Sequence, residues 1–290
     1  MFIVNRYLLI VIALSLGSCG KSQEPSVATS PESSPAAAEN ADLSGVARIV
    51  GEEIRYEAGG TALKGYLAYD AARTGPRPGV LIVHEWWGHN DYVRDRARML
   101  AEMGYTAFAL DMYGDGKQAT HPEDAQKFSM EIFNNMQVGM DRFTAAHDLL
   151  QVHATTDAGK IAAIGYCFGG AVVLHMARSG LDLDAVASFH GSLGTSSPAA
   201  PGAVKARVLV AHGAEDPFVP QADVDAFKAE MQAAGADLTF IAYPGAVHSF
   251  TRPGATEIGE QFDLPLRYDA AADHASWTEL QTFLADSFSD

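Results

Sequence analysis

The chain has 290 residues, with 36 acidic and 20 basic side chains and a formal net charge of −16 at pH 7. This excess of negative charge argues against a nucleic-acid-binding protein and against a basic patch that binds anionic lipid. Beyond the signal-like N-terminus and the polar segment after it, about 240 residues remain, which is a suitable length for one α/β domain with a large core.

The first residues predict an export signal. Arg6 precedes the apolar run 8–16, which is too short to span a membrane, because a spanning helix needs about 20 apolar residues. The sequence "LGSC" that follows is similar to the bacterial lipobox, which implies cleavage after residue 18 and lipidation of Cys19. The similarity, with Gly rather than Asp at position 20, implies an exported envelope protein anchored to the outer membrane and facing the periplasm. An ordinary signal peptide with an incidental cysteine is the alternative.

The next segment predicts a disordered spacer. Residues 19–48 are rich in Ser, Pro, Ala and Glu and have almost no apolar groups to bury. We therefore divide the chain into a signal peptide (1–18), a lipidated N-terminus with a linker (19–48) and a catalytic domain (49–290). If Cys19 is lipidated, Cys167 has no intramolecular disulfide partner.

Short apolar runs alternate with amphipathic segments throughout the domain. "IRYEA" and "LKGYLAY", separated by Gly59-Gly60, predict an antiparallel hairpin. Buried strands are predicted over 79–85, 105–111, 160–166, 185–191, 207–213 and 236–243. Helices are predicted over 92–103, 122–151 (as two helices), 170–178, 221–234 and 274–288. The alternation predicts an α/β fold with a doubly wound, mostly parallel sheet and no separate cap domain.

The sequence "IGYCFGG" predicts a nucleophile turn. Gly165 and Gly169 lie two residues before and after Cys167, which is the G-x-nucleophile-x-G spacing. Glycine is needed there because larger residues would collide with the neighbouring strand or helix. The turn raises the cysteine above the sheet and aims a helix N-terminus at it, which stabilises a thiolate. A buried structural cysteine is the alternative.

Two strand ends offer partners for this cysteine. Asp216 follows the strand 207–213 in "AEDPFVP", and His248 follows the strand 236–243 in "PGAVHSF". The chain order nucleophile, acid, histidine is that of triads on this kind of sheet, and both residues lie at its carboxyl edge. The pattern predicts a Cys167–His248–Asp216 triad, although a loop aspartate and a surface histidine are each common alone.

Residues 50–290 resemble the dienelactone hydrolase family of α/β-hydrolases, whose nucleophile is a cysteine in G-x-C-x-G-G. The resemblance implies Cys167 as nucleophile, His248 as general base and acid, and Asp216 as the group that orients the imidazole. The "HSFTR" stretch also matches, and it places Arg252 where the family has an arginine that holds a substrate carboxylate. A second family arginine, expected around "HPEDAQKF", has no match, so the resemblance does not extend to specificity for dienelactone itself. No cofactor is implied.

The stretch "VHEWWGHND" contributes further candidates. The resemblance implies that Glu85 contacts the resting thiol and that the backbone N–H groups of Trp86 and Phe168 form an oxyanion hole. Trp87 is expected, with Trp86, to wall the substrate pocket, the alternative being core or rim packing.

The histidines of the chain predict no metal site. His84 and His89 are five residues apart, whereas the zinc motif H-E-x-x-H places its histidines four apart on one helical face. For His190 and His212, which end strands, packing is the favoured interpretation.

These residues predict hydrolysis of a small ester or lactone through a thioester acyl-enzyme, with Glu85 taking up the thiol proton when substrate displaces it. A thioesterase or general carboxylesterase with the same triad is an alternative, as is a non-catalytic envelope lipoprotein that reuses the fold. The expected partner is the small-molecule substrate, with membrane contact only through the N-terminal anchor. The oligomeric state is not predicted.

Overall fold

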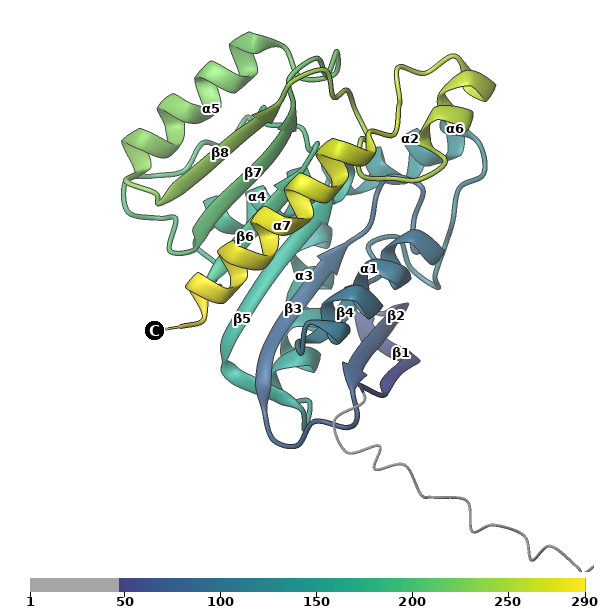
Figure 1. Ribbon diagram of the computed structural model, residues 1–290, viewed down its shortest axis with the longest axis vertical. Coiled ribbons are helices and arrows are strands. Elements are labelled where there is room, and N and C mark those ends of the chain that lie inside the picture. Colours follow the sequence, from purple (N-terminus) through teal and green to yellow (C-terminus); the bar gives the residue numbers. More distant parts are fainter. Residues whose placement is uncertain (1–46, 290) are drawn as a thin grey trace, which may run out of the picture. The chain divides into compact units, whose positions relative to one another are not determined.

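The computed structural model describes residues 47–289 (Figure 1). The predicted signal peptide, Cys19 and nearly all of the linker lie outside these residues, so export and lipidation stay predictions from sequence. Within the described range, no helix is long and apolar enough to cross a membrane.

Eight strands form one sheet in the order β1-β2-β4-β3-β5-β6-β7-β8. The predicted hairpin is β1 (Ile49–Ala58) and β2 (Thr61–Asp70), which pair antiparallel, and β2 also pairs antiparallel with β4. The other neighbours are parallel. The remaining strands are β3 (Arg77–Val83), β4 (Thr106–Leu110), β5 (Thr156–Tyr166), β6 (Ala185–Phe189), β7 (Arg207–Gly213) and β8 (Leu238–Tyr243). The predicted doubly wound, mostly parallel sheet is confirmed.

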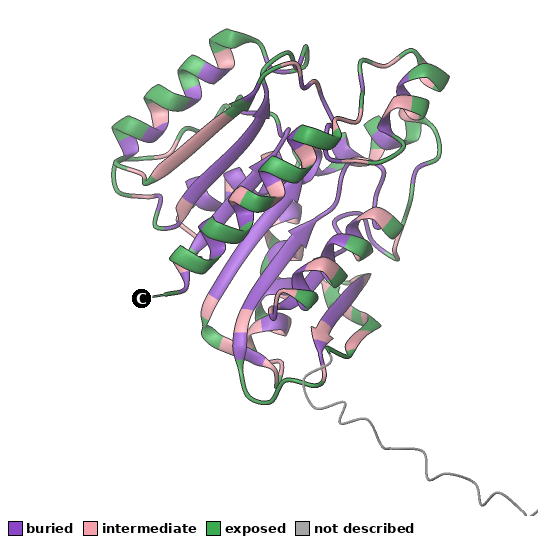
Figure 2. Ribbon diagram, in the orientation of Figure 1, coloured by how far each residue is buried: buried purple, intermediate pink, exposed green. Residues whose placement is uncertain are grey.

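Helices cover both faces of the sheet (Figure 1). On one face, α1 (Asp91–Glu102) and α7 (Ala270–Ser287) share an apolar cluster with Val80 and Ile82. On the other face, Leu81 and Val83 join the cluster formed with α3 (Met136–Gln151), α4 (Phe168–Arg178) and α5 (Gln221–Ala234). Because the central strands are buried on both sides (Figure 2), they are apolar at nearly every position instead of at alternate ones.

Two details of the helices differ from the sequence prediction. The short helix α6 (Ala255–Phe262) was not predicted, because a segment of only 8 residues is too short for its apolar positions, Ala255, Ile258 and Phe262, to form a distinctive helical pattern. Helix α7 begins four residues before the predicted start, since the Asp269 side chain accepts hydrogen bonds from the backbone N–H groups of Ala271 and Ala272 and caps it. The predicted division of 122–151 is confirmed: α2 (Pro122–Phe133) ends and α3 begins at Asn134–Asn135.

Besides His248, four histidines are buried near the carboxyl edge of the sheet: His84, His89, His190 and His212. Burial lowers the pKa of each, to about 4 for His84 and well below its usual value for His190. Since burial disfavours a charged imidazole, these side chains are neutral in the folded protein at pH 7. The core is therefore sensitive to acid.

We predict that the free energy of unfolding falls as the pH is lowered from about 6.5 to about 4. In this window the unfolded histidines take up protons that the folded protein does not bind, so protonation favours the unfolded state. Urea unfolding followed by circular dichroism at about pH 7, 5.5 and 4.5 measures the effect. A midpoint that stays constant or rises on acidification would contradict it.

Candidate active site

The turn from β5 to α4 has the geometry of a nucleophile elbow. Cys167 lies between the two elements with φ 53° and ψ −115°, in the left-handed region that non-glycine residues rarely adopt. A Cβ atom on Gly165 would overlap the Gly169 carbonyl group, and one on Gly169 would overlap the Val83 carbonyl group. Glycine is therefore required at both positions, because β5, α4 and β3 approach one another so closely.

Cys167 sits at the N-terminus of α4, where no side chain caps the helix. Its backbone N–H donates to the Phe189 carbonyl at 3.0 Å, which ties the turn to the neighbouring strand. The side chain is half-buried and its thiol is free. Unpaired N–H groups at a helix N-terminus favour negative charge, so this position suits a thiolate.

Asp216 and His248 lie together at the ends of neighbouring strands. The His248 Nδ1 atom is 2.8 Å from Asp216 Oδ2, and the Asp216 side chain is fully buried. The other carboxylate oxygen, Oδ1, accepts from the Phe218 N–H at 2.9 Å. Because Nδ1–H donates to the carboxylate, Nε2 remains free to interact with the Cys167 sulfur and with a substrate.

Cys167 acts electrostatically on this histidine. Burial lowers the pKa of His248, but the nearby Cys167 sulfur and Asp216 carboxylate, and the hydrogen bonds that the imidazole makes with them, raise it to about 10. The neighbouring Cys167 sulfur and Asp216 carboxylate thus both favour the protonated form of the imidazole. The structure thus brings Cys167, His248 and Asp216 together at one edge of the sheet.

Glu85 and Arg252 differ from the arrangement that the family resemblance implies. Glu85 is buried and its Oε2 accepts from Arg252 Nη1 at 2.6 Å, while its Oε1 accepts from Ser249 Oγ at 3.2 Å. Both carboxylate oxygens are thus directed to the loop after β8 and not to the thiol. The physical reason is that a buried carboxylate needs a charged or hydrogen-bonding partner, and this loop offers two.

A cavity of about 140 Å³ adjoins the sulfur. It is lined by Trp86, Ser129, Phe133, Cys167, Phe168, Ala171 and Ser192. Trp86 thus borders the cavity as expected, whereas Trp87 is buried and lines a separate cavity of about 260 Å³ together with Arg252 and Phe262. Ser129, Phe133 and Ser192 were not candidates, because no motif in the sequence indicates that α2 and the loop after β6 reach the cysteine.

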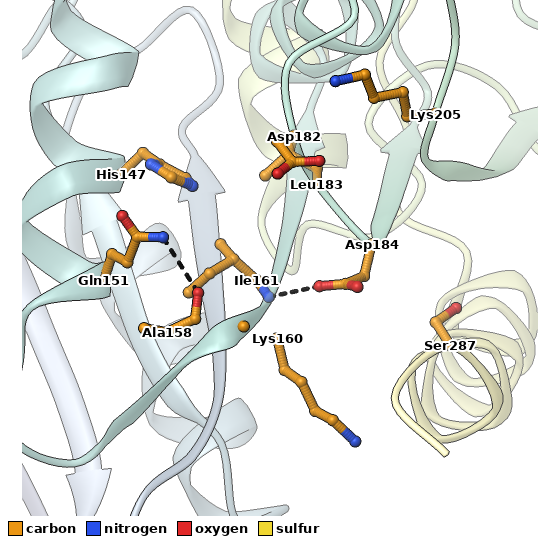
Figure 3. A pocket seen from close by; sticks show the side chains of 11 residues that line it. His147, Gln151, Ala158, Lys160, Ile161, Asp182, Leu183, Asp184, Lys205 and Ser287 are labelled. Carbon is orange, nitrogen blue, oxygen red and sulfur yellow. Dashed lines mark hydrogen bonds between the residues drawn. The ribbon is translucent and has the colours of Figure 1, made fainter. Parts of the chain in front are cut away.

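A larger cavity, of about 440 Å³, lies at the opposite, amino edge of the sheet (Figure 3). Its lining is polar and includes His147, Lys160, Asp182 and Lys205. Figure 3 also shows the Asp184 carboxylate accepting from the backbone N–H of Ile161. Sheets of this kind bind substrates at the carboxyl ends of their strands. The smaller cavity at Cys167 is therefore the better candidate for the reaction centre.

The segment with the two histidines of "VHEWWGHND" forms a loop and not a helix. His84 bonds to backbone groups of residues 85 and 112, whereas His89 Nε2 lies 2.9 Å from the Ala109 carbonyl oxygen. Among residues 47–289, no three His, Cys, Asp or Glu side chains are grouped in a way that could hold a metal ion.

Residues 63–288 match the model of the dienelactone hydrolase family. The chain belongs to the dienelactone hydrolase family. Protein usf of Aquifex pyrophilus is 30% identical over 206 residues, which cover 69% of this chain and 87% of that protein.

Two solved structures support the assignment. The structure m3DLH is 38% identical with a TM-score of 0.78 and covers 83% of this chain and 99% of its own. A dienelactone hydrolase-like promiscuous phosphotriesterase from metagenomic libraries is 34% identical with a TM-score of 0.76, covering 82% and 98%. Family membership indicates a hydrolase that acts on ester or lactone bonds.

We predict that Gly169→Ala destabilises the protein by about 1–3 kcal/mol, because the new methyl group would force β3 and α4 apart. Urea unfolding measures the change, and turnover should fall with it. Gly159→Ala, in β5, is the matched control, since its Cβ would meet only the Asp157 carboxylate, at 3.6 Å. Equal stabilities of the two variants would contradict the assigned role of the turn.

Proposed function

We propose that this protein hydrolyses a small ester or lactone through a thioester on Cys167, with His248 as general acid and base and Asp216 orienting the imidazole. The observation that carries the proposal is the convergence of the strained turn at Cys167 with the Asp216–His248 pair. Backbone strain costs free energy, so a cysteine with only a packing role would not require the strained turn that places Cys167 beside the buried His248.

The reaction proceeds in two steps. The Cys167 sulfur attacks the carbonyl carbon, and the tetrahedral intermediate collapses as the C–O bond breaks and the His248 Nε2–H protonates the leaving alkoxide. The now neutral His248 then takes a proton from water, the resulting hydroxide attacks the thioester, and the thiolate leaves. Asp216 accepts the Nδ1–H hydrogen bond throughout and stabilises the imidazolium. The cycle ends with thiolate and imidazolium restored.

The backbone N–H groups of Trp86 and Phe168 are proposed to hold the oxyanion of each tetrahedral intermediate. Within the described residues, neither group donates a hydrogen bond to a protein acceptor. Both residues line the cavity at the sulfur. Removing one such donor slows other hydrolases by roughly 10²–10³-fold, so the pair would supply a large part of the rate enhancement.

Glu85 has a different proposed role from the one that the family resemblance implied. Its carboxylate holds Ser249 and Arg252, which follow His248 in the same loop, so it supports the histidine and not the thiol. The thiolate is balanced instead by the His248 imidazolium. Arg252 is likewise committed to Glu85, and it borders the second cavity, where it could reach a distal polar group of the substrate.

The acyl group that fits beside Cys167 is small and uncharged. The cavity of about 140 Å³ is below the roughly 300–1,000 Å³ typical of sites for drug-sized ligands. Apart from the cysteine, its lining contains only aromatic side chains, two serines and an alanine. A thioesterase or a general carboxylesterase with the same residues is the alternative, and a panel of lactones, acyl esters and acyl thioesters distinguishes them.

Hydrolysis of neutral phosphotriesters is a second candidate. It is favoured by the uncharged cavity and by the similarity to the promiscuous phosphotriesterase described above. The same thiolate would attack phosphorus in place of carbon, so paraoxon belongs in the substrate panel.

We predict that Cys167→Ala abolishes turnover of p-nitrophenyl acetate and that iodoacetamide labels Cys167 in the wild-type protein. Asp216→Asn should lower kcat by roughly 10⁴-fold, because the imidazole then loses its favoured tautomer. Release of p-nitrophenol and peptide mass spectrometry are the measurements. Full activity in the alanine variant would rule out the mechanism, and absence of both turnover and labelling would favour the non-catalytic alternative.

A further inference from the structure

His84 is a buried polar side chain that the proposed mechanism does not use. It follows β3 directly and precedes the Glu85–Trp86 peptide, whose N–H is one of the two proposed oxyanion donors. The side chain is 0% exposed, so each of its nitrogen atoms needs a partner within the protein.

The hydrogen bonds of His84 fix its tautomer. The backbone N–H of Met112 donates to His84 Nε2 at 3.2 Å, so Nε2 carries the lone pair. The proton of the neutral ring is therefore on Nδ1, which donates to the Glu85 carbonyl oxygen at 2.6 Å. Burial lowers the pKa of His84 to about 4, which is consistent with one neutral form at neutral pH.

This bond to the Glu85 carbonyl also fixes the direction of the Trp86 N–H. The carbonyl and the N–H belong to one planar peptide unit and point in opposite directions. A hydrogen bond on the carbonyl side therefore holds the N–H side in place. It also polarises the peptide, which makes the N–H a stronger donor.

The ring of His84 contacts the second proposed donor residue as well. It stacks on the Phe168 ring with 5.8 Å between centroids and an interplanar angle of 22°. It also packs edge-on against Tyr113 at 4.7 Å, and the Tyr113 hydroxyl donates to the Trp86 carbonyl at 3.1 Å. His84 and Tyr113 thus hold the peptide units on both sides of Trp86.

The loop that supplies these partners is itself fixed. The buried carboxylate of Asp111 accepts hydrogen bonds from four backbone N–H groups, those of residues 64, 113, 114 and 116. This carboxylate orders the loop after β4, from which Met112 and Tyr113 reach His84 and Trp86. The contacts that hold the peptide units around Trp86 therefore depend on the loop after β4, the strand beside β3 in the sheet.

We infer that His84 is a positioning residue of the oxyanion hole, where its Nδ1–H holds the Glu85–Trp86 peptide so that the Trp86 N–H is preorganised for the oxyanion formed at Cys167. The inference rests on the proposed function, because it presupposes nucleophilic attack by Cys167 on a carbonyl group. His84 itself does not touch the substrate.

The test compares two substitutions of His84 in the full-length protein. His84→Phe keeps an aromatic ring against Phe168 but loses both hydrogen bonds. His84→Gln keeps an acceptor for the Met112 N–H and a donor for the Glu85 carbonyl. With p-nitrophenyl acetate, we expect kcat to fall roughly 10–100-fold in His84→Phe with KM nearly unchanged, and at most about fivefold in His84→Gln.

The rate at which iodoacetamide alkylates Cys167 distinguishes a positioning role of His84 from a merely structural one. A structural defect would slow alkylation and turnover together. Alkylation consumes the thiolate but forms no tetrahedral oxyanion, so its rate should equal the wild-type rate in both variants. If turnover and alkylation decline together in His84→Phe, or if turnover is retained there, the inference is wrong. If the wild-type protein is alkylated but hydrolyses no substrate of the panel, the proposed function fails and the inference falls with it.

A measurement on the wild-type protein covers the case in which His84→Phe does not fold. In protein labelled with ¹⁵N-histidine, the imidazole resonances at about pH 7 report which nitrogen of His84 carries the proton. We expect a protonated Nδ1 and an unprotonated Nε2. A protonated Nε2 would overturn the inference, because Nδ1 could then not donate to the Glu85 carbonyl.

Discussion

The close approach of β3, β5 and α4 at the turn around Cys167 is the constraint on which the site depends. The approach is possible only because Gly165 and Gly169 have no side chain, and it holds Cys167 in a left-handed backbone conformation. The sulfur is thereby placed at the N-terminus of α4, half-exposed and beside the free Phe168 N–H. The Asp216–His248 pair, at the ends of β7 and β8, lies beside this sulfur, and its 2.8 Å hydrogen bond orients the imidazole.

Buried polar contacts connect the loops around this turn into one unit. Glu85, after β3, pairs with Arg252 and Ser249 after β8, and His84 bonds to the loop after β4. These contacts are directional, so each loop fixes the position of the next. Such networks specify geometry more than they add stability, since much of their electrostatic gain offsets the cost of burying charge. The proposed oxyanion donors and the histidine therefore share a common support. Substitutions of residues that do not touch the reacting atoms can therefore change the rate of the reaction.

Sequence reasoning recovered what local patterns encode and missed what depends on tertiary packing. The alternation of apolar runs predicted the sheet, and glycine spacing and strand ends brought Cys167, Asp216 and His248 to the same edge. The Glu85–Arg252 ion pair could not be predicted from the sequence, because its members are 167 residues apart and meet only in the folded chain. Phe133 could not be assigned to the cavity, since the position of α2 over the turn leaves no local signature. His84 served only to exclude a zinc motif, because its role depends on Met112 from another loop.

The central claim is that an acyl group passes through the sulfur of Cys167. Rapid mixing of the wild-type protein with p-nitrophenyl acetate, acid quenching within the first turnover and peptide mass spectrometry test it most directly. The account predicts an acetyl group on Cys167 that hydroxylamine removes and that forms and decays at rates compatible with turnover. Steady hydrolysis with an acetyl group on another residue, or with no acetylated peptide at any time, would contradict it.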